Sequence, residues 1–317
     1  MKVATWVMAD GRAIDAALIA GPTASGKSAL AIEIARRTGG VIINADSMQL
    51  YRDLRIITAR PTPEEEAGAP HRLYGVIDAA ENFSVGRWLA AASSLLADVR
   101  EAGRLPIFVG GTGLYFKALM QGLSDIPATP DEVRMRVREE AEGQAPEALH
   151  AKLMERDPET AATLRPSDPQ RILRALEVFE ATGRSLVSFH GERSGALLDT
   201  ARCFKLFLTP DREASRTAID RRFLAMMKEG ALDEVRALKS RGLDPALPAM
   251  RAHGVPGLIA CLNGAMSLEN AIAKGQADTR AYAKRQMTWF RHQMEGWDAA
   301  APDQAREIVA RNFVGAS

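Results

Sequence analysis

The chain has 317 residues, and its 41 lysine and arginine residues nearly balance its 40 aspartate and glutamate residues, which gives a net charge of +1. Its hydrophobic content of 46% is enough to bury a core and excludes a disordered chain. Cys203 and Cys261 lack metal-ligand spacing, which argues against a disulfide scaffold or a zinc site. Charges interrupt residues 1–20, and no run of about 18 apolar residues occurs, so a cytoplasmic protein that does not bind membranes is expected.

Strand-like and helix-like segments alternate in the first part of the chain. Apolar runs predict strands at residues 17–20, 41–43, 74–77 and 106–109. A helical pattern follows a glycine-rich turn from Lys27, and another occupies residues 85–102. This alternation predicts an α/β fold with a P-loop NTPase-like parallel sheet flanked by helices.

The pattern changes after Pro130, where strand-like runs disappear and charged residues become frequent. We interpret residues 131–195 as an inserted, all-helical domain. A strand at 203–208 and further helices over 211–294 then return the chain to its first unit. The predicted organisation is therefore a P-loop core, made of residues 1–130 and 196–317, with one helical insertion.

Residues 21–28 fit the phosphate-binding P-loop pattern G-x-x-x-x-G-K-[ST] completely. In that pattern backbone N–H groups surround phosphate oxygens, Lys27 neutralises charge between two phosphates, and the hydroxyl of Ser28 can hold Mg²⁺. A helix that begins at Lys27 adds the positive end of its dipole. The predicted di- or triphosphate site, which would also suit ATP, consists of Gly21, Pro22, Thr23, Ala24, Ser25, Gly26, Lys27 and Ser28.

Polar side chains follow two of the predicted strands. Asp46 and Gln49 come after the strand at 41–43, and Thr112 stands among glycines after the strand at 106–109. Open α/β sheets bind ligands at the carboxyl ends of their strands. Asp46 could therefore be a general base that faces an acceptor substrate, a helix N-cap, or a group near Mg²⁺. Thr112 could lie against a ligand or cap the next helix.

Six segments, in this order along most of the chain, make the sequence resemble the tRNA dimethylallyltransferase family, also called tRNA isopentenyltransferases. They are GPTASGKS at 21–28, NADSMQLY at 44–51, PHRL at 70–73, VGGTGLY at 109–115, DPQRILRALE at 168–177 and AKRQ at 283–286. The resemblance implies transfer of a dimethylallyl group from dimethylallyl diphosphate to the exocyclic N6 amine of the adenine 3′ of the anticodon, which gives N6-dimethylallyladenosine. It also implies Mg²⁺ as the cofactor, the tRNA anticodon stem-loop as the partner, and a monomer.

The resemblance also assigns roles to individual residues. Asp46 corresponds to the base that takes a proton from the amine, Thr112 to a residue near the reacting centre, and Arg222 to an arginine on the diphosphate, where Lys27 also lies. The implied tRNA contacts are Asp46, Ser47, Met48, Gln49, Thr112, Arg134, Gln170, Arg171, Ile172, Leu173 and Arg174.

Two helical patterns offer surfaces for RNA. Asp168 and Gly183 predict the ends of a helix that turns Ile172 inward and Gln170 and Arg174 outward. On a later helix a basic strip runs beside an apolar face and consists of Arg280, Lys284 and Arg291. From the pattern alone, both surfaces fit a solvated helix face equally well.

The sequence departs from the family pattern at three places. Ile57 stands where the family usually has a flexible glycine, and Ala218 stands where many relatives have a second arginine near the diphosphate. Gly254 is followed by Val255 and Pro256, where the family often has a Gly-Tyr pair.

Three other functions fit parts of the pattern. A P-loop kinase that uses ATP and Mg²⁺ would leave the segment at 168–177 and the late basic strip unexplained. An isopentenyltransferase acting on free adenine nucleotides would have little need for the helical insertion. A non-catalytic RNA-binding module would leave the phosphate cradle without a use.

Overall fold

The computed structural model describes residues 6–191 and 194–313, and the chain divides into two compact units. The first, which we call the core unit, joins Met1–Met120 to Leu197–Ser317. The second, the helical unit, comprises Gln121–Ala196. The insertion predicted at 131–195 lies within the helical unit, which begins earlier because α4 (Gly113–Gln121) ends there.

A parallel sheet of six strands forms the centre of the core unit, in the order β5-β4-β6-β3-β7-β8. Its strands are β3 (Ala16–Ala20), β4 (Val41–Asn44), β5 (His71–Arg72), β6 (Pro106–Gly110), β7 (Cys203–Leu208) and β8 (Asp298–Ala300). Two further short strands, β1 (Trp6–Val7) and β2 (Ala13–Ile14), pair with each other in antiparallel fashion. The predicted α/β fold with a parallel sheet is confirmed.

The sheet differs from the sequence prediction at both edges. The strand predicted at 74–77 is wrong: β5 is His71–Arg72, and the chain then turns, with positive φ angles of 63° at Leu73 and 60° at Gly75. Ile77 keeps only an isolated parallel bridge, to Tyr51. The opposite edge strand, β8, was not predicted because its short, largely exposed segment contains no apolar run.

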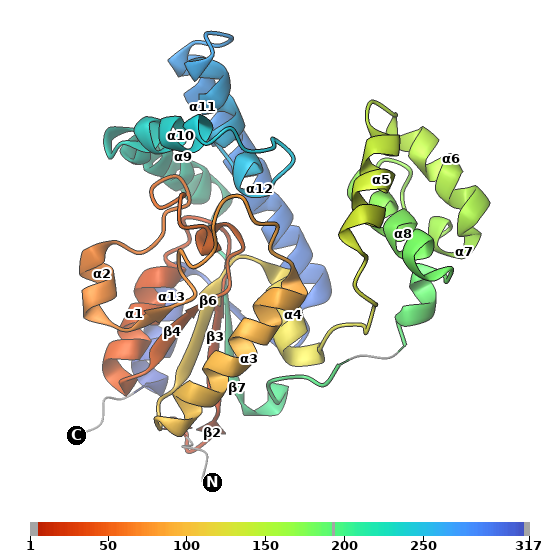
Figure 1. Ribbon diagram of the computed structural model, residues 1–317. Coiled ribbons are helices and arrows are strands. Elements are labelled where there is room, and N and C mark those ends of the chain that lie inside the picture. The colour runs from red at the N-terminus through yellow and green to blue at the C-terminus, as the bar shows by residue number, and fades with distance from the viewer. Residues whose placement is uncertain (1–5, 192–193, 314–317) are drawn as a thin grey trace. The chain divides into compact units, whose positions relative to one another are not determined.

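Different helices cover the two faces of the sheet (Figure 1). On one face α1 (Lys27–Thr38) and α13 (Pro302–Asn312) pack against the strands. The core on this face includes Ile19, Leu30, Ile34, Ile107, Leu206 and Val309. On the other face α3 (Val85–Glu101) brings Trp88 edge-on to Phe108 of β6, with 6.4 Å between ring centroids. Because both faces are covered, the strands are apolar almost throughout.

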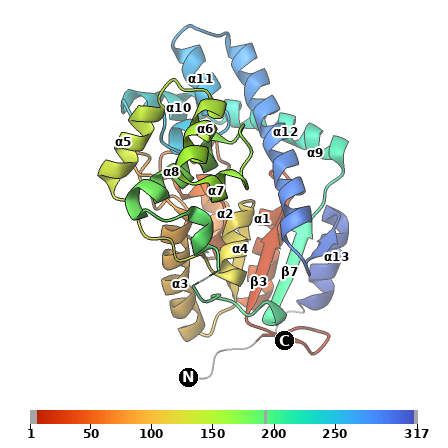
Figure 2. The ribbon, with the colours of Figure 1, turned by 90° about the vertical axis from the view of Figure 1, so that its right-hand side faces the viewer.

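More helices gather beyond the edge where the strands end (Figure 1). They are α9 (Arg212–Lys228), α10 (Ala231–Ser240), α11 (Val255–Leu262) and the beginning of α12 (Leu268–Gln293). Figure 2 shows α12 running back from these helices beside β7. There Phe290 of α12 stacks on Phe207 of β7, with ring centroids 4.4 Å apart. Within the described residues no helix is long and apolar enough to cross a membrane.

The helical unit has a small core of its own. Its helices are α5 (Asp131–Ala141), α6 (Pro146–Arg156), α7 (Pro158–Ala161) and α8 (Pro169–Thr182). They enclose Val137, Leu149, Leu153, Ala161, Ile172, Ala175 and Leu176. The predicted ends of α8 are confirmed, because the Asp168 side chain accepts a hydrogen bond from the backbone N–H of Arg171 and Gly183 ends the helix with φ 66°.

Candidate active site

Three neighbouring strands bring the predicted site residues to one edge of the sheet. The P-loop follows β3, Asp46 follows β4, and Thr112 follows β6. Since β4, β6 and β3 are adjacent and parallel, their carboxyl ends meet at the same edge. The predicted juxtaposition of the phosphate cradle, Asp46 and Thr112 is therefore what this topology produces.

The P-loop has the backbone conformation of an anion cradle. Ala24 and Gly26 both have positive φ, at 60° and 86°, so the chain curls before α1 begins at Lys27. No side chain caps the start of α1, which leaves its first N–H groups available to an anion. The hydroxyl of Ser25 is buried and has no hydrogen-bond partner among the described residues. An oxyanion in the loop would satisfy these donors.

Gln286 of α12 supports the cradle through two hydrogen bonds. Its Oε1 accepts a hydrogen bond from the backbone N–H of Thr23 at 3.1 Å, and its Nε2 donates to the carbonyl of Gly111 at 2.8 Å. A Cβ on Gly111 would lie 2.0 Å from that Nε2, so glycine is required for the contact. The amide thus ties the loop after β3 to the loop after β6. In the sequence Gln286 belongs to the AKRQ segment, and the signal for its role is an amide on an otherwise apolar helix face.

The strand-end loop places the Asp46 carboxylate. Asn44 is fully buried and fixes the turn, since its Oδ1 accepts from the backbone N–H of Asp46 at 2.8 Å and its Nδ2 donates to the carbonyl of Leu73 at 3.0 Å. One oxygen of Asp46, Oδ1, accepts from the backbone N–H of Met48 at 3.1 Å, as an N-cap would. The other, Oδ2, has no partner within residues 6–191 and 194–313 and remains able to accept a proton.

Thr112 lies beside this loop. Its hydroxyl oxygen accepts a hydrogen bond from the backbone N–H of Ser47 at 3.0 Å. Gly110, two residues earlier, permits the approach, because a Cβ there would lie 2.1 Å from the carbonyl of Ala45. Thr112 therefore joins the loop after β6 to the loop that carries Asp46.

Two cations and one carboxylate act on each other at this edge. Burial lowers the pKa of Lys27 to about 8, the Asp46 charge opposes that shift, and the Arg222 guanidinium adds to it. Burial also lowers the pKa of Arg222, against the attraction of Glu65 and Asp46. Lys27 donates to the carbonyl of Pro22 at 3.2 Å, and no salt bridge is formed by Lys27, Asp46 or Arg222 in the described part of the chain. Excess positive charge in a desolvated place fits an anionic ligand.

A cavity of about 70 Å³ connects the cradle to Asp46 and Arg222. Its polar lining includes Thr23, Asp46, Arg222, His253 and Tyr282. Its apolar lining includes Met48, Ile57, Ile219, Phe223 and Met226. The site therefore offers an apolar compartment directly beside a phosphate cradle and a carboxylate.

His253 and Tyr282 were not predicted as site residues. Their rings lie 4.6 Å apart between centroids, and both border the cavity. Burial, and then the charge of Arg285, lowers the pKa of His253, so its ring is neutral near pH 7. Burial, and then the Asp46 charge, raises the pKa of Tyr282, which keeps its hydroxyl protonated. His253 supplies the aromatic ring of a loop in which Val255 begins α11 and Pro256 follows.

The other two departures have structural counterparts. The side chain of Ile57 is buried and borders the cavity that holds Asp46. Ala218 borders a separate cavity of about 340 Å³ beside Ser25. Arg221 and Arg306 line this cavity too. Two arginine residues therefore still line the cavity beside the P-loop where position 218 has no charge.

The remaining residues of the Asp46 loop have mixed roles. Met48, at the start of the 3-10 turn η1 (Met48–Leu50), borders the cavity. Gln49 donates from Nε2 to the carbonyls of Thr58 and Ala59, at 2.9 Å each, so its amide holds a neighbouring loop.

The RNA candidates of the helical unit divide into exposed and occupied side chains. Gln170 and Arg171 are exposed on α8, where Arg171 lies 3.4 Å from Asp168 in a surface ion pair. Arg174, expected to point freely outward, is half-buried and donates to the hydroxyl of Thr129 at 2.8 Å. Arg134 pairs with Asp131 at 2.7 Å and also donates to the Thr129 carbonyl. Ile172 is fully buried and Leu173 packs against the core of the unit, so these two side chains fix the helix.

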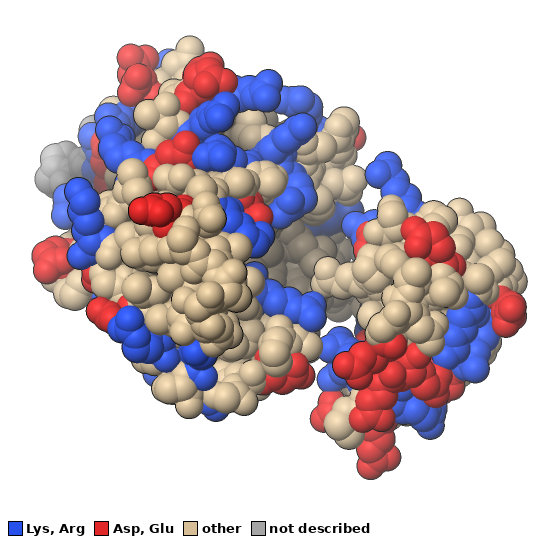
Figure 3. Space-filling view, turned by 90° about the horizontal axis from the view of Figure 1, so that it is seen from above, with Lys and Arg blue, Asp and Glu red and all other residues tan. Residues whose placement is uncertain are grey.

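The late basic strip is only partly available. Arg280 forms an ion pair with Asp220 of α9, whereas Lys284 and Arg291 are exposed on α12. Figure 3 shows lysine and arginine side chains gathered along one part of the core unit's upper face, with acidic residues among them. The near-zero net charge is thus an average over local patches of both signs.

The fold and the site define a P-loop α/β protein whose cradle opens on an acidic and apolar cavity. The sequence model of the IPP transferase family matches residues 49–293. The tRNA dimethylallyltransferase of Methylobacterium sp. (strain 4-46) is 64% identical over 297 residues, which cover 93% of this chain and 97% of that protein. This chain therefore belongs to the IPP transferase family and is an enzyme, as the six segments predicted.

Solved structures show the same likeness. The full-length tRNA isopentenylpyrophosphate transferase from Bacillus halodurans has a TM-score of 0.66 and 34% identity, over 93% of this chain and 94% of that one. A eukaryotic dimethylallyltransferase acting on tRNA has a TM-score of 0.73 and 29% identity, over 87% of this chain and 69% of that one.

Proposed function

We propose that the protein transfers a dimethylallyl group from dimethylallyl diphosphate to the N6 amine of the adenine 3′ of the anticodon in tRNA, with release of diphosphate. The observation that carries this proposal is that one cavity borders the P-loop, Asp46, Arg222 and an apolar wall together. A dimethylallyl diphosphate molecule has the matching parts: an anionic end for the cradle and a small apolar end for the wall.

The reaction needs a base on one side of the allylic carbon and an anion site on the other. Adenine N6 is a poor nucleophile because its lone pair is delocalised into the ring, so a carboxylate within ~3 Å should remove its proton as the new bond forms. Asp46 has an oxygen for this proton. As the C–O bond breaks, negative charge grows on the leaving diphosphate, where the P-loop N–H groups, Lys27 and Arg222 would stabilise it.

The donor set also fits Mg²⁺ bound together with the diphosphate. The Ser28 hydroxyl, in the first turn of α1, has no hydrogen-bond partner among the described residues, and these contain no cluster of three or more His, Cys, Asp or Glu that could hold a metal alone. Mg²⁺ prefers one or two protein ligands with phosphate oxygens and water, so Ser28 would hold it. When bound, the ion would neutralise charge on the leaving group.

Recognition of tRNA is the second half of the proposal. A stacked adenine cannot reach a carboxylate at a strand end, so the base must leave the anticodon loop. The exposed Gln170, Arg171, Lys284 and Arg291 are suited to contact bases or phosphates of such a loop. We propose that the anticodon stem-loop is sufficient for binding and that the protein acts as a cytoplasmic monomer.

The test uses the purified protein with labelled dimethylallyl diphosphate, Mg²⁺ and one of three acceptors. These are unmodified tRNA, the same tRNA with guanine replacing the adenine 3′ of the anticodon, and AMP. We expect label only in the unmodified tRNA, and loss of transfer with EDTA. Label in AMP alone would favour the free-nucleotide transferase, and phosphate transfer from ATP without prenyl transfer would favour a kinase.

A further inference from the structure

The loop at residues 53–60 forms one wall of the active-site cavity. Ile57 and Thr58 of this loop border the same cavity as Asp46 and Arg222. Ile57 is 6% exposed, and its Cδ1 would lie 3.0 Å from a Cβ on Gly254, which places it against the start of α11. The wall belongs to no helix or strand, so other elements must hold its position.

Glu234 of α10 binds the backbone of this loop through one carboxylate. Its Oε2 accepts from the N–H groups of Arg55 and Ile56, at 2.7 and 2.8 Å, and its Oε1 accepts from the N–H of Ile57 at 2.9 Å. Three successive N–H groups pointing at one anion form a concave anion site. Hydrogen bonds to a charged acceptor are short and roughly twice as strong as neutral ones.

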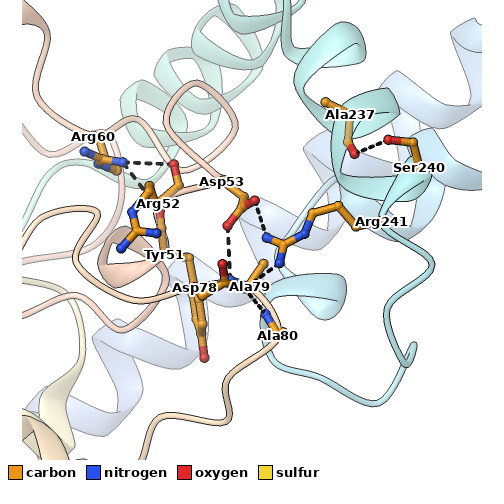
Figure 4. A network of polar contacts seen from close by, with 10 residues as sticks. All are labelled: Tyr51, Arg52, Asp53, Arg60, Asp78, Ala79, Ala80, Ala237, Ser240 and Arg241. Atoms are coloured by element: carbon orange, nitrogen blue, oxygen red, sulfur yellow. Dashed lines mark hydrogen bonds and ion pairs between the residues drawn. The ribbon is translucent and has the colours of Figure 1, made fainter.

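A second connection from α10 fixes the beginning of the same loop (Figure 4). Arg241, which follows α10, donates to Asp53 and, at 2.6 Å, to Asp78, while Asp53 also accepts from the N–H of Ala79 at 3.0 Å. Gln49 holds the far side through the carbonyls of Thr58 and Ala59. The loop is thus anchored at both ends, and among the described residues only Glu234 accepts from the N–H of Ile57 itself.

We infer that Glu234 is a positioning residue that sets the wall at Ile57 and thereby the length of prenyl chain that the cavity accepts. This inference rests on the proposed function, because it assigns the apolar compartment to the prenyl group. A glutamine at 234 keeps the size of the side chain but presents one carbonyl oxygen and an NH₂ group to three N–H donors. The wall would then lose at least one of its three bonds and move away from α11.

The first variant to test is Glu234→Gln, with Asp233→Asn as its matched control. Asp233 is the adjacent acid in the first turn of α10, is exposed and pairs with Arg236, so it loses the same charge without touching the loop. For Glu234→Gln we expect the KM for dimethylallyl diphosphate to rise several-fold, because a displaced wall packs less closely on the prenyl group, with kcat little changed. We also expect the preference for dimethylallyl over geranyl diphosphate to fall about tenfold.

A second variant, Ile57→Ala, shortens the wall directly and leaves the Glu234 bonds in place. It should shift chain-length preference in the same direction, and the double variant should show less than the sum of the two effects, because both act on one wall. Amide exchange at Arg55, Ile56 and Ile57 should accelerate in Glu234→Gln only. This second variant keeps the inference testable if Glu234→Gln folds poorly.

Unchanged chain-length preference in both variants would overturn the inference, as would an equal shift in Asp233→Asn. A uniform loss of kcat with both prenyl diphosphates would mean that Glu234 only stabilises the fold. If the wild-type protein itself transfers no prenyl group to tRNA, the proposed function fails instead, whatever the amide exchange shows.

Discussion

The active-site edge of the core unit and the helical unit use charge in opposite ways. In the core unit Lys27, Asp46 and Arg222 border the cradle and its cavity, and burial lowers the pKa of both cations. In the helical unit basic side chains mostly lie within ion-pairing distance of acids, as do Arg134, Arg136, Arg138, Lys152, Arg156, Arg171 and Arg174.

The unpaired charges at the cradle are suited to bind a ligand, whereas the paired charges of the helical unit stabilise the fold. A desolvated cation without an acid partner lowers the stability of the empty protein, so its presence indicates that an anion completes the site. The ion pair between Arg138 and the buried Glu177, 3.0 Å apart, is already neutral and needs no ligand. Substitutions of Lys27, Asp46 or Arg222 should therefore reduce turnover, and substitutions in the helical unit should reduce stability or RNA binding.

The largest effect is expected for Asp46→Asn. The amide keeps an oxygen for the Met48 N–H but cannot take the proton from adenine N6, so turnover should fall ~10²–10⁴-fold while tRNA binding stays largely intact. Single-turnover transfer from labelled dimethylallyl diphosphate measures the first, and a filter-binding titration measures the second. The control is Asp98→Asn on the exposed surface of α3. An Asp46→Asn enzyme of full activity would remove Asp46 from the chemistry.

The next effect is expected for Arg222→Ala. Loss of one preorganised donor to the leaving diphosphate should reduce kcat about 10²–10³-fold, and removal of a buried like charge should raise the pKa of Lys27. Arg216→Ala, an exposed arginine on the same helix, is the control. Equal rates for the two variants would contradict the placement of Arg222 at the leaving group.

Much of this site could be predicted because its signals are local in the sequence. The P-loop and the strand before it are short runs that can be recognised without any distant partner. The strand predicted at 74–77 was wrong because Tyr74, Val76 and Ile77 resemble a strand, whereas Leu73 and Gly75 adopt the positive φ angles that turn the chain.

The distant partners of Gln286 and Glu234 could not be found in this way. Gln286 reaches Thr23 and Gly111, and Glu234 reaches the 55–57 backbone, across separations of more than a hundred residues. Their side chains bind backbone groups, which leaves no complementary residue type in the sequence to suggest a partner.

The pH dependence of kcat/KM should reveal the contribution of the Lys27 charge. Its pKa in the free enzyme is lowered to about 8, so the cation is present below that pH and is lost above it. Hence kcat/KM for dimethylallyl diphosphate should fall by up to about tenfold per pH unit above 8, since this parameter reports groups of the free enzyme. A Lys27→Arg enzyme, slower but permanently charged, should lack this decline. The same decline in both enzymes would assign it to another group.

The smallest effect, and the sharpest test of the helical unit, comes from Arg171→Ala compared with Arg174→Ala. Arg171 is exposed, so its loss should weaken tRNA binding several-fold and reduce the slope of log K against log salt by about one, with an unchanged Tm. Arg174 donates to Thr129 and lies 3.8 Å from the buried Glu177, so its loss should lower the Tm.

Arg136→Ala on α5 is the control for this pair, because its exposed pair with Glu180 is worth only about 0–1 kcal/mol and Glu180 keeps Arg156 as a partner. A change of tRNA affinity alone in Arg174→Ala, or of Tm alone in Arg171→Ala, would contradict the assignment of Arg171 to RNA binding and of Arg174 to stability. A paired arginine of the helical unit would then be held in place for RNA, because an ion pair can orient a side chain as well as neutralise it.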